Sequence, residues 1–289
     1  MLFLFYVKIF FIFSLGLCLG SFLNVLVDRR KKEKSLLGFS ECDFCKHKLF
    51  WWENIPVLSF LFLKGKCLKC RKKLSWQYPT VELSVGLLFL AVAFWSGFFE
   101  AGFQANTFPS NSGFVYFGII DWLVMIFWLI SSFLLAVVFL WDLKYMEIPN
   151  GIVFGGVCLA IIFSVFQIFV MNEYYEAWWK NPFFFGLFGA SAVSLFFYLM
   201  YFFSGGKWIG GGDVKLGFWL GWLVGLPMVY PLLLVSYVLG AIVSLGLIFF
   251  GKKKMSSKVP FGPFLIVGYF LILFFGKNMI ELWKSILAY

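Results

Sequence analysis

The sequence predicts an all-α polytopic membrane protein with about eight transmembrane helices. Of its 289 residues, 62% are hydrophobic, 23% are aromatic and only 13% are charged. A soluble fold cannot bury 42 Phe and 13 Trp residues beneath so little polar surface, so soluble, disordered and disulfide-rich secreted classes are excluded. The apolar runs are continuous and lack the alternation of barrel strands, which favours helices over a closed β-barrel.

Eight segments are apolar over about the 20 residues that a helix needs to cross a bilayer. The first, residues 3–27, is too long for the core of a signal peptide. Its positive cluster follows it instead of preceding it, so we interpret it as a retained helix. The segment 211–226 is short for a span. The predicted spans are 3–27, 79–98, 119–140, 150–171, 182–203, 211–226, 228–250 and 260–276.

Basic residues are concentrated on one side of this predicted topology. Of the 24 Lys and Arg residues, 20 fall in four alternate connections between spans: 28–78, 141–150, 204–215 and 251–259. The positive-inside rule therefore places these connections in the cytosol and both termini outside. Orientation in the bilayer explains the net charge of +10 without a nucleic-acid partner, and anionic lipid headgroups are a secondary partner for the basic loops.

Three parts of the chain are expected from this pattern. Residues 1–27 form the first transmembrane helix, and residues 28–78 form a cytosolic loop long enough to be a small domain. Residues 79–289 form a membrane core with about seven further helices. No oligomeric state is predicted.

Four of the six Cys residues form two CxxC pairs within the cytosolic loop. Cys42 and Cys45 are followed, after a gap of 21 residues, by Cys67 and Cys70, close to the spacing of two knuckles around one zinc. Disulfides are disfavoured in a reducing cytosol, and a loop of about 50 residues with few aliphatic side chains cannot build its own core. We therefore predict a closed, structural zinc site that supplies folding free energy. The alternative is four unrelated thiols.

The other metal-ligand candidates are interpreted as ordinary packing or surface residues. Cys18 and Cys158 lie within apolar runs, where a free Cys behaves as a small hydrophobe. His47 is the only histidine, and we interpret it as an exposed loop residue and not as a ligand or a general base.

Two aspartates lie at predicted helix ends on the cytosolic side. Asp142 ends the third predicted helix, and Asp213 follows Gly210, Gly211 and Gly212 at the start of the sixth. Ionisable groups at such a place are costly and point to function. If the two carboxyls meet, like-charge repulsion lets them share one proton, so that one activates water while the other donates to a carbonyl oxygen. The alternative is that Asp213 is a helix N-cap and Asp142 a snorkelling interfacial residue.

Taken together, the motifs resemble those of the prepilin peptidases, the type IV prepilin leader peptidase and N-methyltransferase family of GxGD-type aspartic proteases. The resemblance spans nearly the whole chain. It implies an enzyme of the bacterial plasma (inner) membrane that removes the basic leader of type IV prepilins or pseudopilins and then methylates the new N-terminal residue with S-adenosylmethionine. The matching segments are 20–25, the two CxxC pairs, 54–59, 63–67, 78–82, 142–149, 210–215 and 260–264.

On the matching positions, the resemblance implies that Asp142 and Asp213 are the catalytic pair and that Cys42, Cys45, Cys67 and Cys70 hold the zinc. It also links Gly65 and Lys66 to methyl transfer. No Gly-rich strand-turn-helix for S-adenosylmethionine is visible, so that cofactor rests on the resemblance alone. The chain departs from the common pattern at Asp28, Asp43 and Asn150, the last standing where Asp is common.

Two other classes of protein account for part of the sequence. A cation- or proton-coupled transporter would use Asp142 and Asp213 as intramembrane relay groups. A non-catalytic scaffold of a secretion system would use the cysteine loop to dock partner proteins. Loss of leader cleavage on mutation of either aspartate is expected only for the peptidase.

Overall fold

The computed structural model describes residues 2–31, 35, 38–42, 44–99, 117–171, 181–251 and 259–287. Within these residues the chain is helical, and its only extended pairings are two isolated β-bridges. The predicted all-α class is therefore confirmed. The chain divides into two compact units, Met1–Val137 and Val138–Tyr289, each of which is described by itself.

The first unit contains two long helices joined by the cysteine-containing loop. The loop itself carries a single 3-10 turn and one short helix. The elements are α1 (Leu2–Lys31), η1 (Trp51–Asn54), α2 (Leu58–Phe62), α3 (Gln77–Trp95) and the first part of α4 (Phe117–Tyr145).

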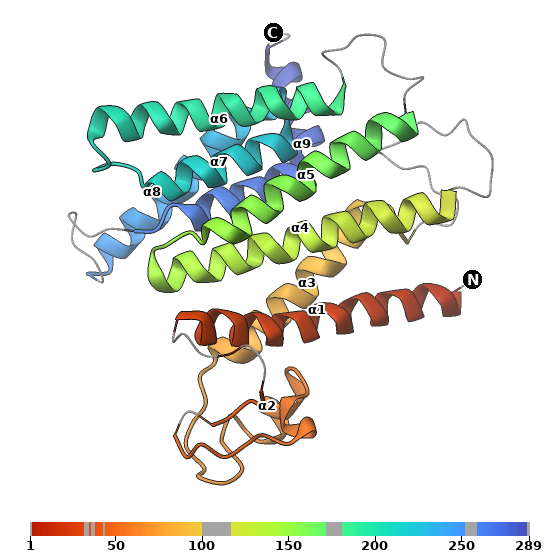
Figure 1. Cartoon of the computed structure of the whole chain (residues 1–289), viewed down its shortest axis with the longest axis vertical. Coiled ribbons are helices and arrows are strands. Elements are labelled where there is room, and N and C mark those ends of the chain that lie inside the picture. The colour runs from red at the N-terminus through yellow and green to blue at the C-terminus, as the bar shows by residue number, and fades with distance from the viewer. Residues whose placement is uncertain are drawn as a thin grey trace. The chain divides into compact units, whose positions relative to one another are not determined.

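Helices α1 and α3 pack backbone to backbone. A Cβ atom added at Gly16 would lie 2.7 Å from the Cα of Gly86, and one added at Gly20 would lie 2.7 Å from the Cα of Glu82. Only glycine permits so close an approach, as is common between membrane helices. The end of α1 and the start of α3 consequently lie together where the loop leaves the helices (Figure 1).

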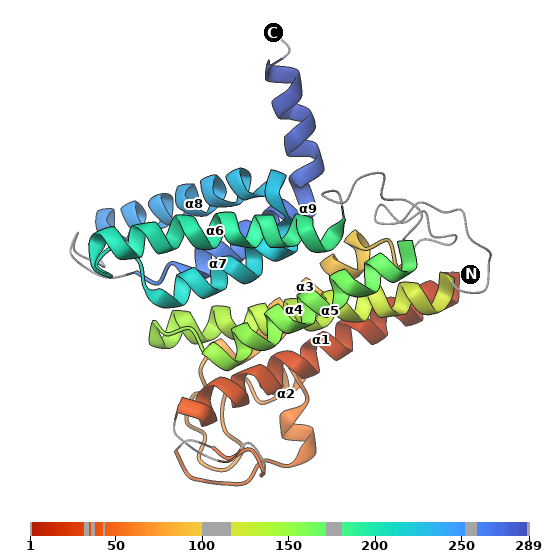
Figure 2. The same ribbon diagram turned by 45° about the horizontal axis from the view of Figure 1, so that its top comes forward.

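The second unit is built around α6 and α7, which run side by side (Figure 2). Gly189 of α6 and Gly221 of α7 face each other so closely that a Cβ atom on either would collide with the other's carbonyl oxygen. The elements of this unit are the end of α4, α5 (Asn150–Met171), α6 (Pro182–Ser204), α7 (Gly211–Val224), η4 (Leu226–Met228), α8 (Val229–Phe249) and α9 (Gly262–Leu287).

Six helices in the described part of the chain are long and apolar enough to cross a membrane, which makes the chain a multi-pass membrane protein. They fall on six of the eight predicted spans. The other two predicted spans are helical but shorter, because α7 has 14 residues and the apolar part of α9 has 15. The six are Phe3–Arg29, Gln77–Trp95, Ile120–Tyr145, Asn150–Val170, Pro182–Ser204 and Leu226–Phe249.

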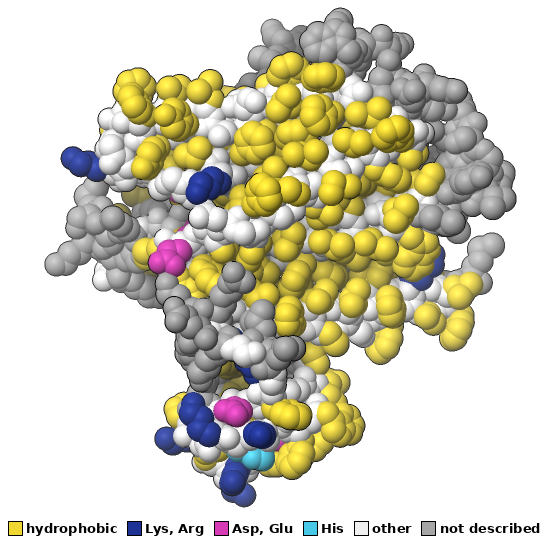
Figure 3. All heavy atoms as spheres, in the orientation of Figure 1, with side chains coloured by type: hydrophobic (Ala, Val, Ile, Leu, Met, Phe, Trp, Pro, Cys, Tyr) yellow, Lys and Arg dark blue, Asp and Glu magenta, His cyan; other side chains and the backbone are white. Residues whose placement is uncertain are grey.

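Large apolar side chains are exposed along the outer faces of these helices. Phe10, Phe154, Phe169 and Phe249 are each more than 70% exposed, and Figure 3 shows apolar side chains over most of the visible helical surface. Basic side chains gather instead on the loop between α1 and α3. Helices that are apolar on all sides are stable when lipid covers them, in keeping with a membrane location.

Candidate functional site

Asp142 lies in the last turn of α4 and is buried, with 4% of its surface exposed. The backbone N–H of Met146 donates to the Asp142 carbonyl (2.9 Å), and Met146 has a positive φ of 54°. The chain therefore reverses at Met146, and Pro149 stands directly before α5, where its fixed φ suits the start of a helix. The predicted end of this helix at Asp142 is placed three residues too early.

Asp213 lies in the first turn of α7 and is also buried, with 9% exposed. The N-cap is Gly210, and its N–H donates to the Asp213 Oδ2 atom (3.2 Å). The predicted helix start after the glycines is confirmed. Asp213 is not the N-cap itself, although its carboxylate accepts a hydrogen bond from the N-cap backbone.

The two aspartates interact in the second unit. The charge of Asp142 acts electrostatically on Asp213, and the backbone N–H of Gly262 at the start of α9 donates to the Asp142 carboxylate. The Ile148 side chain lies 3.1 Å from a Cβ atom added at Gly212, and it lies 3.4 Å from one added at Gly262. The beginnings of α7 and α9 are thereby brought together at the end of α4.

The residue before Gly262 forms an aromatic wall beside this region. The Phe261 ring lies 5.0 Å from the Tyr237 ring and 5.9 Å from the Phe197 ring, centroid to centroid. The Tyr237 hydroxyl lies 3.2 Å from the Met200 sulfur, and it interacts electrostatically with the Asp213 carboxylate. Residues 260–264, one of the segments that carry the family resemblance, therefore contribute both a hydrogen-bond donor and packing to the aspartate region.

The four cysteines of the loop meet in one cluster. The Sγ atoms of Cys42 and Cys70 lie 3.9 Å apart, as do those of Cys45 and Cys67, and all four lie within 4.8 Å of one another. Four thiolates at about 2.3 Å from one tetrahedral zinc would lie about 3.8 Å apart. The four thiols therefore fit the predicted metal, and their meeting excludes four unrelated cysteines.

The two cysteine hairpins have the same backbone pattern. The N–H groups of Cys42 and Cys67 each donate to the carbonyl five residues further on, at 2.9 and 3.0 Å. In each hairpin the residue after the second cysteine has a positive φ, 57° at Lys46 and 55° at Arg71. The backbone N–H of Cys70 lowers the pKa of Cys67 to about 7, which favours the thiolate that metals bind.

His47 is not the exposed loop residue that the sequence suggested. Its side chain is 17% exposed, its Nε2 atom lies 3.4 Å from Glu53 Oε2, and its ring packs edge-on against Phe50. The prediction was wrong because the turn at η1 folds back over the first hairpin. Sequence reasoning missed Glu53 altogether, since nothing in its neighbours marks it as buried.

Gly65 and Lys66 begin the second hairpin. Gly65 has a φ of 66°, and its carbonyl accepts from the Leu74 N–H (2.8 Å). An added Cβ atom would lie 2.9 Å from the Phe60 ring, so glycine is required here both for backbone conformation and for space. Lys66 pairs with Lys73 across the hairpin. Neither residue belongs to the cysteine cluster itself.

The motifs at 20–25 and 78–82 meet at the junction of the helices with the loop. Asn24 donates to the Tyr78 carbonyl (3.4 Å) and accepts from Gln77 (3.2 Å). Glu82 accepts from the Val57 N–H (2.7 Å). Asn24 and Glu82 therefore find their polar partners at the start of α3 and in the loop.

The fold and these two centres define a multi-pass membrane protein with a buried aspartate pair and a separate four-cysteine cluster. Comparison with protein families agrees with both parts. Residues 14–96 match the model of the Bacterial Peptidase A24 N-terminal domain, and residues 128–245 match the Type IV leader peptidase family. No solved structure matches the chain.

Curated relatives match nearly the whole chain. A prepilin leader peptidase/N-methyltransferase of Bacillus subtilis (strain 168) is 30% identical over 93% of this chain and 95% of its own. Proteins of the same name are 29% identical in Stutzerimonas stutzeri, over 92% and 90%, and 30% identical in Pseudomonas putida, over 92% and 90%. The chain belongs to the type IV leader peptidase family of enzymes.

Proposed function

We propose that this chain removes the basic leader from type IV prepilins or pseudopilins, with Asp142 and Asp213 as the catalytic pair, and that it methylates the newly exposed N-terminal residue. The observation that carries the peptidase half is the burial of both carboxylates at the adjoining ends of α4 and α7. Buried carboxylates that act on each other are the arrangement in which one ionises while the other keeps its proton.

The ionised carboxylate acts as a general base in this proposal. It takes a proton from water, and the water oxygen forms a bond to the scissile carbonyl carbon while the other carboxyl donates its proton to the carbonyl oxygen. Collapse of the tetrahedral intermediate breaks the C–N bond. The amine leaves with a proton from the first carboxyl, and the second carboxylate takes back a proton from a hydroxyl of the intermediate. The Gly262 N–H holds the Asp142 carboxylate in place for these transfers.

The proposed orientation follows from the distribution of basic residues. The four connections that carry 20 of the 24 Lys and Arg residues lie in the cytosol, and both termini lie outside the bacterial plasma membrane. The cysteine loop and the ends of α4 and α7 then share the cytosolic face. A prepilin, with a charged leader followed by an apolar stretch, would present its cleavage junction at that face.

Residues 28–78 are proposed as the methyltransferase region, and residues 79–289 as the peptidase core. Cys42, Cys45, Cys67 and Cys70 would hold a structural zinc, because all four ligand positions are filled by protein and none is left for a substrate. S-adenosylmethionine supplies a methyl group on a sulfonium. When that cofactor is bound, the amine nitrogen of the new N-terminus would accept the methyl group and release a proton, and the sulfur would leave as a neutral thioether.

The peptidase half is tested with purified protein and a prepilin in detergent. Replacing Asp142 or Asp213 by Asn keeps the shape of the side chain and removes its charge. Each change should lower the rate of leader cleavage by at least about 100-fold, the lower end of what a general acid or base contributes. Asp121 is the matched control because it is an aspartate near the opposite end of α4, and Asp121→Asn should cleave normally.

Cleavage at an appreciable rate by either single Asn variant would contradict the catalytic pair. Mass analysis of the substrate N-terminus in the same assay reports methylation separately from cleavage. A precleaved substrate should still be methylated by the Asp142→Asn protein. If no variant changes cleavage while ion transport is lost, the transporter interpretation is favoured instead.

A further inference from the structure

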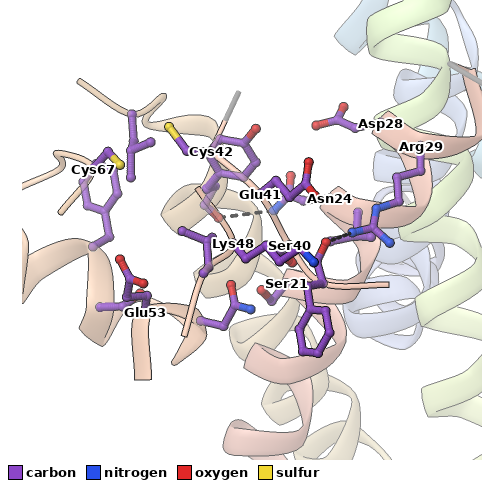
Figure 4. A pocket seen from close by; sticks show the side chains of 18 of the residues that line it. Ser21, Asn24, Asp28, Arg29, Ser40, Glu41, Cys42, Lys48, Glu53 and Cys67 are labelled. Carbon is purple, nitrogen blue, oxygen red and sulfur yellow. Dashed lines mark hydrogen bonds between the residues drawn. The ribbon is translucent and has the colours of Figure 1, made fainter. Parts of the chain in front are cut away.

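A cavity of about 550 Å³ lies in the first unit, between the end of α1, the start of α3 and the two cysteine hairpins (Figure 4). Ser21, Asn24 and Asp28 line it from α1, and Cys42 and Cys67 line it from the hairpins. Its volume falls within the roughly 300–1,000 Å³ of small-molecule sites and far exceeds the space of a single metal ion.

The walls of the cavity combine apolar, acidic and basic side chains, and the basic ones are Arg29, Lys46 and Lys48. Phe39, Leu49 and the largely buried Phe60 supply apolar surface. A site of this kind suits a ligand that has a flat apolar part, carries charges of both signs and offers several hydrogen-bond donors. The carboxylates that line the cavity are Asp28, Glu41, Glu53 and Glu82.

One of these carboxylates, that of Glu53, has an oxygen without a hydrogen-bond partner among the described residues. Glu53 is 6% exposed, its Oε2 atom accepts from the Phe50 N–H (2.9 Å), and its Oε1 atom is buried without a hydrogen-bond partner among the described residues. A buried polar atom without a partner costs about 1–3 kcal/mol, and more when it is charged. The described residues therefore supply no donor to the Glu53 Oε1 atom.

The neighbouring buried carboxylate shows the contrast. Glu82 is 8% exposed, and it accepts from the Val57 N–H (2.7 Å) and from the Ser21 hydroxyl. The described residues thus satisfy Glu82 and leave the Glu53 Oε1 atom without a hydrogen-bond partner. A carboxylate that holds the loop together needs no ligand, whereas the free oxygen of Glu53 points to one.

Gly65 sets one wall of the same cavity. The Phe60 ring, which lines the cavity, lies against Gly65 so closely that a Cβ atom there would come within 2.9 Å of the ring. Any larger residue at position 65 would push the ring inward. The residue lies behind the cavity wall and not in the cavity.

We propose that this cavity binds S-adenosylmethionine and that Glu53 Oε1 accepts a hydrogen bond from it. The proposal rests on the methyltransferase half of the proposed function. The ligand carries a sulfonium, an α-ammonium and two ribose hydroxyls, which complement the carboxylates, and an adenine ring, which suits the apolar wall. Both the ammonium and the hydroxyls can donate to Glu53. Competition for binding by methionine, which carries the ammonium, and by adenosine, which carries the hydroxyls, distinguishes the two donors.

The test measures binding of radiolabelled S-adenosylmethionine to the purified, zinc-loaded, full-length protein in detergent. In Glu53→Gln the remaining amide oxygen still accepts from Phe50, but the negative charge is lost. The dissociation constant should rise at least tenfold, as expected for a charge-assisted hydrogen bond. Asp121→Asn, which removes a carboxylate elsewhere in the same unit, should bind as the wild type does.

A second measurement does not depend on the folding of a variant. Ultraviolet photolabelling of the wild-type protein with S-adenosylmethionine, followed by peptide mass mapping, should place the label on residues that line the cavity. Zinc content and leader cleavage show whether Glu53→Gln is folded. If the Glu53→Gln variant loses its zinc or its leader cleavage, the labelled peptides of the wild-type protein decide whether the cavity is the binding site.

The proposal is overturned if the folded Glu53→Gln protein binds as tightly as the wild type, or if the label falls outside the cavity residues. In both cases the wild type still binds and methylates, so the proposed function stands and only the site is wrong. A wild-type protein that neither binds S-adenosylmethionine nor methylates a cleaved substrate fails the methyltransferase proposal itself, and the cavity assignment with it.

Discussion

The Lys215 Nζ atom donates a 2.9 Å hydrogen bond to the Asn150 Oδ1 atom, which joins the first turn of α7 to the first residue of α5. Two residues before Asn150, the Ile148 side chain packs against Gly212. The bond therefore holds the turn after Asp142 against the glycines that precede Asp213.

Replacing Lys215 by Met should weaken leader cleavage without abolishing it. A hydrogen bond of this kind contributes about 0.5–1.5 kcal/mol, so kcat/KM should fall about 2- to 10-fold. Asn150→Ala should have a similar effect, and the double variant should be no worse than either single one, because both remove the same bond. Lys207→Met is the control, because it removes a lysine from the connection between α6 and α7 and leaves the bond between Lys215 and Asn150 in place. Strictly additive losses in the double variant would show that the bond does not couple the two segments.

Replacing Gly262 by Ala should disable cleavage while leaving the protein folded. The new Cβ atom would lie 2.5 Å from Asp142 Oδ2, so the carboxylate has to move. A displacement of about 1 Å in a catalytic group costs about 100-fold in rate. Gly155→Ala adds the same atom inside α5 where nothing lies within 4 Å, and it should cleave normally. Equal rates for the two variants would argue against a role for Asp142 in the reaction.

Removing the metal should loosen the loop and spare the aspartates. Purified protein should contain about one zinc per chain, held at about 2.3 Å from each sulfur. Chelation, or Cys42→Ser, should make residues 38–76 sensitive to limited proteolysis, because metal binding supplies folding free energy. Cys18→Ser and Cys158→Ser should retain the metal. Well under one zinc per chain with all thiols free would refute the metal centre.

Replacing Gly65 by Ala should reduce methylation more than cleavage. A residue with a side chain pays about 1–2 kcal/mol for a left-handed conformation, and the added carbon also meets the Phe60 ring. Gly251 has the same φ of 66°, but nothing lies within 4 Å of an added Cβ atom, so Gly251→Ala separates backbone strain from the collision. Mass analysis of the substrate N-terminus measures both activities. Unchanged methylation by the Gly65→Ala protein would contradict the link between this glycine and methyl transfer.

Hydropathy predicted the existence of the helices better than their lengths. The predicted span 211–226 corresponds to α7, which ends at Val224 because Gly225 takes a φ of 70° and breaks the helix. The predicted span 260–276 corresponds to only the first part of α9. Apolar composition continues through such breaks, so a window of about 20 residues does not detect them.

The cysteine cluster could be predicted because its spacing along the chain directly reflects the knuckle geometry. The contacts that hold the two aspartates in place could not be predicted in this way. Gly262 donates to Asp142 from a helix that begins 120 residues later, and Ile148 fills the space beside it. Such contacts depend on how helices pack, which a single sequence does not encode in any local pattern.

Single charged residues were the least predictable. His47 lies in a loop rich in charge and was expected to face water, and no sequence pattern singled out Glu53, yet the fold of the loop buries the carboxylate and most of the imidazole. Burial of one side chain in a segment without periodicity is set by tertiary contacts alone. The partner that such a residue lacks is visible only once the surrounding groups are in place.

The glycine contact between α1 and α3 also bears on how the loop acquires its metal. The free energy needed to close a flexible chain grows with the logarithm of its length, by about 0.6 kcal/mol for each doubling. Packing of Gly16 and Gly20 on α3 already holds both ends of the loop together, so most of this loop-closure entropy is lost before a metal binds. Metal then has only two short hairpins to order, and its affinity depends on glycines within the membrane that never touch it.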